Sequence, residues 1–165
     1  MTGGHVYLVG MPGSGKSSAG RAAADLLGIP FIDLDQEIES AAGASIEEIF
    51  RDEGEARFRE LERDALERVA ATPPAVVACG GGVPLREDNR DLMRSTGSVV
   101  ALDVPVGRLW ARVAAGFPRP LVTGPVDLRR LDRERRSAYQ EAAHHRVDGA
   151  GSPEDVARRI AEVLR

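Results

Sequence analysis

The feature that most constrains the fold of this chain is a glycine-rich segment near its N-terminus. Gly10 to Ser17 reads Gly-Met-Pro-Gly-Ser-Gly-Lys-Ser, which fits the pattern G-x-x-x-x-G-K-[ST]. An apolar run at 5–9 predicts a strand before it, and helical spacing predicts a helix over about 16–27 after it. In this context the backbone N–H groups of the turn and the positive end of the helix can surround phosphate oxygens. The segment therefore predicts a phosphate-binding loop, or P-loop, that takes ATP with Mg²⁺.

Two side chains of this loop have separate predicted tasks. Lys16 is expected to contact the β- and γ-phosphates, and Ser17 to ligate Mg²⁺. The 22 lysine and arginine residues of the chain include one lysine, Lys16. Its retention indicates a task that needs a compact ammonium group rather than a planar guanidinium. The alternative is a plain glycine turn, which the lone lysine disfavours.

The rest of the chain alternates predicted strands with predicted helices. Further apolar runs predict strands at 30–32, 75–79 and 98–104 and around Val147. Helices are predicted from the capping signal at Ser45, over 54–71, 105–115 and 127–145, and after the capping signal at Ser152. This order predicts an α/β fold with a five-stranded parallel sheet, helices on both faces, and ligands at the carboxyl ends of the strands. A Gly/Pro-rich loop at about 115–125 resembles a mobile lid.

Length and composition bound the remaining possibilities. With 165 residues and 42% apolar content, we expect a single domain over residues 1–165. The net charge of −4 argues against a nucleic-acid partner, and no run approaches the roughly 20 apolar residues of a membrane span. The single cysteine, Cys79, lies in an apolar run and is expected to be buried and inert. We expect a cytoplasmic monomer.

Two acidic residues follow the predicted strand at 30–32. Asp33 and Asp35 are two positions apart, so their carboxylates can point in the same direction at the strand end. One could hold metal-bound water while the other orients a substrate hydroxyl. The alternative is that both are N-terminal capping residues of the next helix.

Two further patterns are ambiguous on their own. Gly80, Gly81 and Gly82 follow an apolar strand and either allow close approach of a ligand or form a simple tight turn. Arg59 and Glu62 lie three positions apart on one helix face and could form no more than a surface ion pair.

Taken together, the motifs of the chain resemble those of the shikimate kinase family over nearly its whole length. The family pattern has, in order, G-x-x-G-x-G-K-S, D-x-D, G-E-x-x-F-R-x-x-E, G-G-G, R-P-L and E-R-x-x-x-Y. Here these read Gly10 to Ser17, Asp33 and Asp35, Gly54-Glu55 through Phe58-Arg59 to Glu62, Gly80 to Gly82, Arg119-Pro120-Leu121, and Glu134-Arg135 through Tyr139.

The resemblance implies a single-domain P-loop kinase fold and transfer of the ATP γ-phosphoryl group to the 3-hydroxyl of shikimate. It implies catalytic roles for Lys16, Asp35 and Arg119, with Arg119 on the lid. Asp33 would join Ser17 at the Mg²⁺, and Glu62 would orient Arg59. The nucleotide would be bound by Gly13, Ser14, Gly15, Lys16, Ser17, Ser18, Arg112 and Arg119. Shikimate would be bound by Asp35, Arg59, Gly80, Gly81, Gly82 and Arg135.

Two rival functions remain open from the sequence. A different small-molecule kinase on the same scaffold, such as a gluconate kinase, would share the P-loop, although the two arginines and three glycines of the implied pocket disfavour it. A non-catalytic ATP-binding module would keep the nucleotide site but lack turnover.

Overall fold

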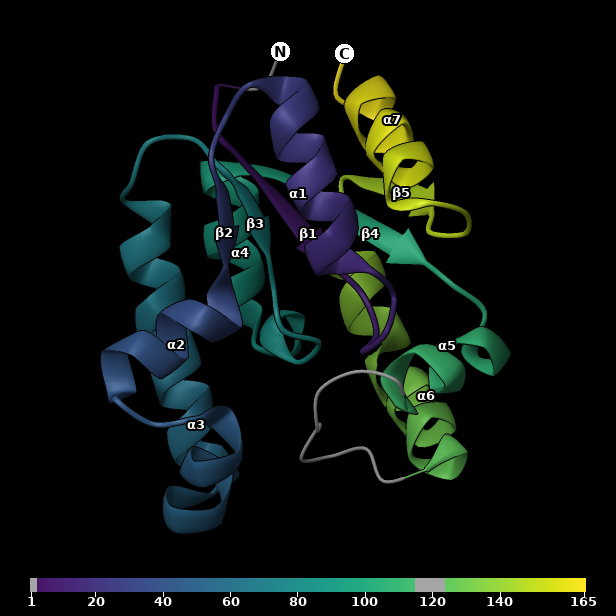
Figure 1. Cartoon of the computed structure of the whole chain (residues 1–165). Coiled ribbons are helices and arrows are strands. Elements are labelled where there is room, and N and C mark those ends of the chain that lie inside the picture. Colours follow the sequence, from purple (N-terminus) through teal and green to yellow (C-terminus); the bar gives the residue numbers. More distant parts are fainter. Residues whose placement is uncertain (1–2, 115–123) are drawn as a thin grey trace.

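The computed structural model describes residues 3–114 and 124–165, whose five strands form one parallel sheet (Figure 1). The strand order is β2-β3-β1-β4-β5. The strands are β1 His5–Val9, β2 Phe31–Asp33, β3 Val76–Ala78, β4 Gly97–Asp103 and β5 His145–Asp148. The predicted five-stranded parallel α/β fold is confirmed.

The central strand β1 is buried over its whole length because both of its faces are covered. Val6 and Leu8 pack with residues of α1 (Lys16–Leu27) and α7 (Pro153–Val163). Figure 1 shows these two helices side by side on one face of the sheet. This double coverage explains why the strand has no apolar–polar alternation in its sequence.

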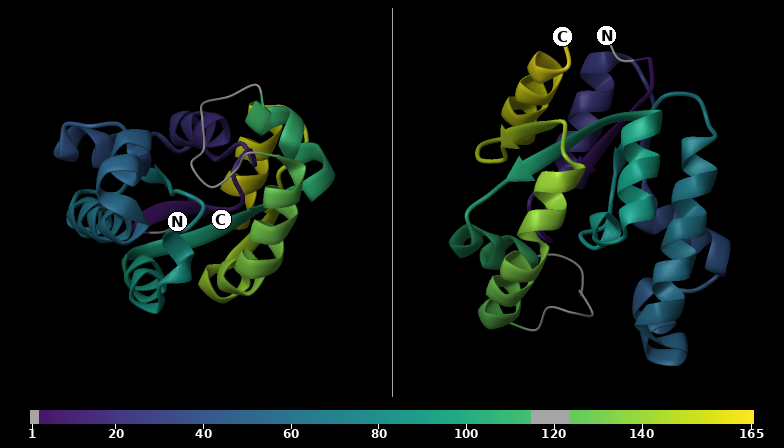
Figure 2. Two further views of the ribbon diagram at one scale, coloured as in Figure 1. Left: turned by 90° about the horizontal axis from the view of Figure 1, so that it is seen from below. Right: turned by 180° about the vertical axis from the view of Figure 1, so that it is seen from behind.

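The opposite face of the sheet carries the larger core. Tyr7 and Val9 point to this side, where they pack with residues of α3 (Ile46–Ala70), α4 (Glu87–Thr96) and α6 (Pro125–Ala142). Figure 2 shows these helices from behind. Cys79 belongs to this core and is 1% exposed, as predicted for this cysteine. Burial raises the pKa of its thiol, which disfavours the reactive thiolate.

Two predicted helices join into α3. Its first turn is capped by Ser45, whose hydroxyl accepts a hydrogen bond from the Glu48 N–H at 3.1 Å. Gly54 interrupts the helical geometry with φ 85° and ψ 171°, and the helix continues to Ala70. The boundary predicted at residue 54 is therefore a kink rather than a separate start.

The helix α4 and the short 3₁₀ turn at Val83–Leu85 were not predicted from the sequence. The sequence of α4 is Glu-Asp-Asn-Arg-Asp-Leu-Met-Arg-Ser-Thr, which offers one apolar pair rather than a repeating stripe. No side chain caps its N-terminus at Arg86. The helix thus lacks both of the sequence signals on which its prediction would depend.

The remaining helices are α2 (Leu34–Ala42) and α5 (Val106–Ala114). Helix α6 ends at Ala142, three residues before the predicted end at 145, because His145 already belongs to β5. The predicted lid at 115–125 lies outside the described residues except for Gly124 and Pro125, where α6 begins. Within 3–114 and 124–165, every helix is too short or too polar to cross a membrane.

Candidate functional site

The P-loop connects the carboxyl end of β1 to α1, as predicted. Gly13 and Gly15 have φ of 82° and 88°, a left-handed conformation that side chains disfavour, and Gly15 forms the N-cap of α1. Ser14 between them is 2% exposed. Alternating conformations of this kind turn successive backbone N–H groups toward one concavity, where an anion can bind.

Lys16 lies within this concavity. Its Nζ donates hydrogen bonds to the carbonyl oxygens of Gly10 at 2.7 Å and Met11 at 3.0 Å, and its distance to the Ser14 hydroxyl is 3.4 Å. The ammonium group is therefore held over the loop by backbone oxygens and does not support the core. Ser17 and Ser18 lie in the exposed first turn of α1.

Helix α5 packs directly against the P-loop. The guanidinium of Arg112 donates to the Gly13 carbonyl oxygen at 3.2 Å. A methyl group on Gly13 would lie 2.8 Å from the Val113 Cγ2 and 3.0 Å from the Leu109 carbonyl oxygen, so the loop and the helix are in close contact. The structure thus places Arg112 beside the loop residues with which the resemblance groups it.

Asp33 combines the two alternatives that its sequence position left open. Its Oδ1 accepts a hydrogen bond from the Asp35 N–H at 3.0 Å and caps α2. Its Oδ2 accepts one from the Ser17 hydroxyl at 3.3 Å. The capping bond fixes the carboxylate while its second oxygen faces the P-loop. Mg²⁺ prefers oxygen ligands, and here a hydroxyl oxygen and a carboxylate oxygen lie close together. The two residues predicted to hold the metal therefore fit the ion.

The 80–82 loop packs against functional side chains from three other elements. A methyl group on Gly80 would lie 3.0 Å from the Asp35 Oδ1 and 3.3 Å from the Glu62 Oε2. One on Gly81 would lie 2.7 Å from an Arg135 guanidinium nitrogen, and one on Gly82 would lie 2.6 Å from an Arg59 guanidinium nitrogen. Because a Cβ at these positions would force the facing charged groups to move, the three glycines allow those groups to approach the loop closely.

Glu62 is part of this group and not of a surface ion pair. It is 1% exposed, and its Oε1 accepts a hydrogen bond from Arg59 at 3.0 Å. Burial raises the pKa of the Glu62 carboxyl, although the nearby Arg59 opposes the shift. A buried carboxylate on one side of the guanidinium fixes its direction far better than an exposed one would.

Arg135 lies on α6 and is 4% exposed. Within the described residues, its Nε is a buried polar atom without a hydrogen-bond partner. A buried arginine with unused donor capacity beside a glycine loop fits the binding of an anion. Together with Arg59, it supplies two guanidinium groups to the same loop.

Sequence reasoning gave no role to two residues that support the loop and the turn after it. Tyr139, one helical turn after Arg135, donates a hydrogen bond to the Gly81 carbonyl oxygen at 2.7 Å. The fully buried Asn89 donates to the Val83 carbonyl oxygen at 3.0 Å and accepts from Arg63 at 3.2 Å. The four-residue spacing from Arg135 was a usable signal for Tyr139, whereas Asn89 lies on the helix that the sequence did not predict.

The sheet order explains why these groups converge. Strand β3 lies between β1 and β2, so the 80–82 loop emerges between the P-loop and the Asp33–Asp35 segment. Pro12 of the P-loop would be 3.2 Å from a methyl group on Gly81, so the two loops touch. The predicted residue Arg119 lies outside the described residues.

The P-loop, with Asp35, Arg59 and Arg135 gathered around the 80–82 loop directly beside it, has the arrangement of a P-loop phosphotransferase. The family model for shikimate kinase matches residues 12–165 of the chain. A shikimate kinase of Salinibacter ruber is 49% identical over 96% of this chain and 83% of its own length. The chain belongs to the shikimate kinase family, and it is an ATP-dependent kinase that uses Mg²⁺.

Solved structures agree with this membership. The shikimate kinase of Acinetobacter baumannii, solved in complex with shikimate, has a TM-score of 0.94 and 36% identity, and covers 98% of this chain and 92% of its own. A gluconokinase of Sinorhizobium meliloti has a TM-score of 0.61 at 22% identity over 98% of this chain and 91% of its own. The gluconokinase likeness shows a shared fold alone.

Proposed function

We propose that the protein transfers the γ-phosphoryl group of ATP to the 3-hydroxyl of shikimate, in the biosynthesis of aromatic amino acids. The observation that carries the proposal is the contact between the P-loop and the 80–82 loop, with Asp35, Arg59 and Arg135 gathered around the latter. Phosphoryl transfer depends on in-line positioning and on neutralisation of charge more than on covalent chemistry. A donor site and an acceptor site in direct contact meet the first of these needs.

On the donor side, backbone N–H groups from Gly13 to Ser17 would hold the phosphates, with Ser18 and Arg112 at the periphery. Lys16 would turn from its carbonyl partners to the phosphate oxygens. Bound Mg²⁺ would supply charge neutralisation to the phosphates, and Ser17 and Asp33 are the residues that would hold it. Arg119 would add a further positive charge from the lid.

On the acceptor side, Arg59 and Arg135 would bind the carboxylate of shikimate. Guanidinium groups present parallel N–H donors to carboxylate oxygens, and Glu62 would hold Arg59 in that orientation. Asp35 would accept a hydrogen bond from the attacking hydroxyl and orient or deprotonate it. Backbone groups of Gly80, Gly81 and Gly82 would complete the pocket. We further propose that the protein acts as a monomer.

The two rival functions place different requirements on the residues of the site. Gluconate also carries a carboxylate, so the arginine pair alone does not separate a gluconate kinase from a shikimate kinase. A non-catalytic module needs no acidic residue such as Asp35 beside the glycine loop. The arrangement around the 80–82 loop therefore favours a kinase over a non-catalytic module, and the family membership of the chain favours shikimate over gluconate.

A coupled assay of ADP release with shikimate, quinate, gluconate and no acceptor tests the proposal. We expect rapid release with shikimate and slow release with the other three. Faster release with gluconate would assign the chain to the first rival. ATP binding without release in any of the four reactions would assign it to the second.

A further inference from the structure

Tyr139 lies at the junction between the two halves of the site. Its hydroxyl donates to the carbonyl oxygen of Gly81 at 2.7 Å and lies 3.8 Å from the sulfur of Met11. Gly81 belongs to the acceptor loop, and Met11 belongs to the P-loop. One hydroxyl group thus touches both loops.

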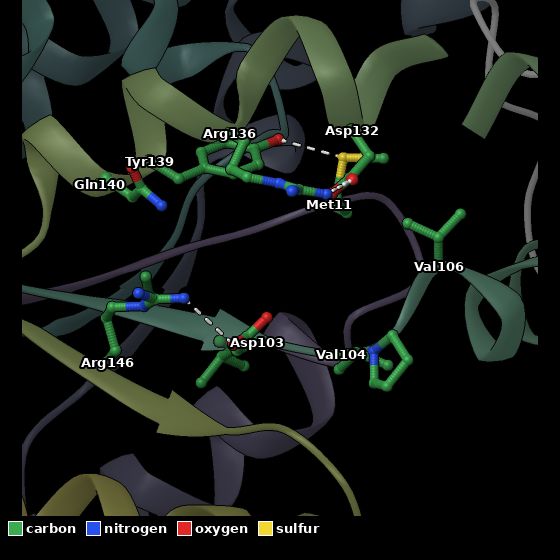
Figure 3. A pocket seen from close by; sticks show the side chains of 12 residues that line it. Met11, Asp103, Val104, Val106, Asp132, Arg136, Tyr139, Gln140 and Arg146 are labelled. Atoms are coloured by element: carbon green, nitrogen blue, oxygen red, sulfur yellow. Dashed lines mark hydrogen bonds and ion pairs between the residues drawn. The ribbon is translucent and has the colours of Figure 1, made fainter. Parts of the chain in front are cut away.

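The ring of Tyr139 is packed but has open space on one side. It belongs to an apolar cluster with Met11 and with Leu109, Leu128 and Leu131 of α5 and α6. It also borders a cavity of about 360 Å³ between α6 and the ends of β4 and β5 (Figure 3). The cavity leaves the ring room to shift on that side. The hydrogen bond from the Tyr139 hydroxyl to Gly81 is therefore the contact that holds the ring and the loop in a fixed relative position.

The position of the Gly81 peptide affects both halves of the site. A methyl group on Gly81 would lie 2.7 Å from an Arg135 guanidinium nitrogen and 3.2 Å from the Pro12 ring, so this glycine packs closely against both α6 and the P-loop. A shift of this peptide therefore moves the loop relative to the Arg135 guanidinium and to the P-loop at the same time. Burial raises the pKa of Tyr139 to about 12, so the hydroxyl remains a donor through the neutral range.

We propose that Tyr139 is a positioning residue whose hydroxyl fixes the 80–82 loop against the P-loop and thereby sets the geometry of acceptor binding. The inference rests on the proposed function, since it assumes that this loop binds the acceptor. Tyr139 acts through Gly81 and through the neighbouring Arg135 guanidinium, and it does not contact the reacting atoms.

The chain offers a matched control, because it has two tyrosines. The hydroxyl of Tyr7 forms a hydrogen bond with the Thr96 hydroxyl, also at 2.7 Å, and Tyr7 is 0% exposed in the core away from both loops. Tyr7→Phe and Tyr139→Phe each remove one buried hydroxyl and leave the ring in place. A loss of structure alone would affect the two variants alike.

The experiment compares steady-state kinetics and thermal unfolding of the wild type, Tyr139→Phe and Tyr7→Phe. For Tyr139→Phe we expect the KM for shikimate to rise about tenfold, the scale of one lost hydrogen bond, with the KM for ATP within about twofold of wild type. Tyr7→Phe should keep both KM values and lower Tm by at least as much as Tyr139→Phe.

Two results would overturn the inference. One is a KM for shikimate in Tyr139→Phe that matches that of Tyr7→Phe. The other is an equal rise of the KM for ATP and the KM for shikimate in Tyr139→Phe, which would indicate general loosening. A wild type that releases no ADP with shikimate would instead refute the proposed function. In that case titration of ADP and shikimate binding by calorimetry still tests whether Tyr139→Phe weakens the acceptor site selectively.

Discussion

The P-loop and the proposed acceptor pocket of this protein are built in opposite ways. The P-loop is one continuous segment, and even its lysine is held by carbonyl oxygens of the same loop. The proposed acceptor pocket takes Asp35 from the start of α2, Arg59 and Glu62 from α3, its glycines from the loop after β3, and Arg135 from α6. The first site is a property of local sequence, whereas the second exists only after the sheet has formed.

This difference predicts how the two sites respond to substitution. Changes in the P-loop act on a local anion site and should leave acceptor binding intact. Changes around the 80–82 loop should weaken acceptor binding and leave nucleotide binding intact. Substitutions in the two sites test this separation.

Lys16→Ala should reduce kcat by about 10³-fold or more, because it removes a positive charge that is expected at the transferring phosphate. Its Tm should remain close to that of the wild type, since the Nζ contacts loop carbonyls and not the core. Lys16→Arg should rescue little activity, because a planar fork does not replace a compact ammonium group. A near-native kcat for the arginine variant, measured by ADP release, would refute this assignment.

Asp35→Asn should lower kcat by about 10²-fold, the scale of a positioned acid–base group, with ATP affinity nearly unchanged. The matched variant is Asp33→Asn, which alters the carboxylate that accepts from Ser17. It should shift the Mg²⁺ concentration needed for half-maximal activity. Identical Mg²⁺ titrations for both variants and the wild type would contradict this division of roles.

Gly82→Ala should raise the KM for shikimate by about tenfold, because the new methyl group would displace the Arg59 guanidinium, the flexible end of a side chain. The KM for ATP should not change. Gly107→Ala on α5 is a suitable control, since nothing lies within 4 Å of a methyl group at that position. If Gly82→Ala behaves like Gly107→Ala in shikimate kinetics, Arg59 does not bind the acceptor from its position beside the loop.

The sequence predicted local features of the fold well. Helix α1 occupies Lys16–Leu27 as its glycine boundaries indicate, and Ser45 and Ser152 cap α3 and α7. In each case the signal and the structure lie within a few residues of each other. Helix α4 was missed because tertiary packing of Met93, which is fully buried, stabilises a segment that has no periodic apolar stripe of its own.

The site residues also fall into those that local sequence predicts and those that depend on tertiary packing. Spacing alone identified the P-loop, but it could not distinguish a buried Arg59–Glu62 pair from a surface pair, because burial depends on what packs above the helix. The glycine loop packs against both side chains of this pair, and it is remote from them in sequence. The resemblance to a family supplied that long-range information, and the role of Tyr139 became visible only from its contact with Gly81.

The central claim is that Arg59 and Arg135 bind the carboxylate of the acceptor beside the P-loop. The most direct test compares kcat/KM for shikimate and for its carboxamide in the wild type and in Arg59→Ala. Charge-assisted hydrogen bonds contribute about 1.5–3 kcal/mol each, so the wild type should use the carboxamide on the order of 10²-fold less efficiently. In Arg59→Ala that ratio should shrink markedly, because a group that discriminates between acid and amide is gone. An unchanged ratio in both Arg59→Ala and Arg135→Ala would show that the carboxylate is bound elsewhere and would contradict the account.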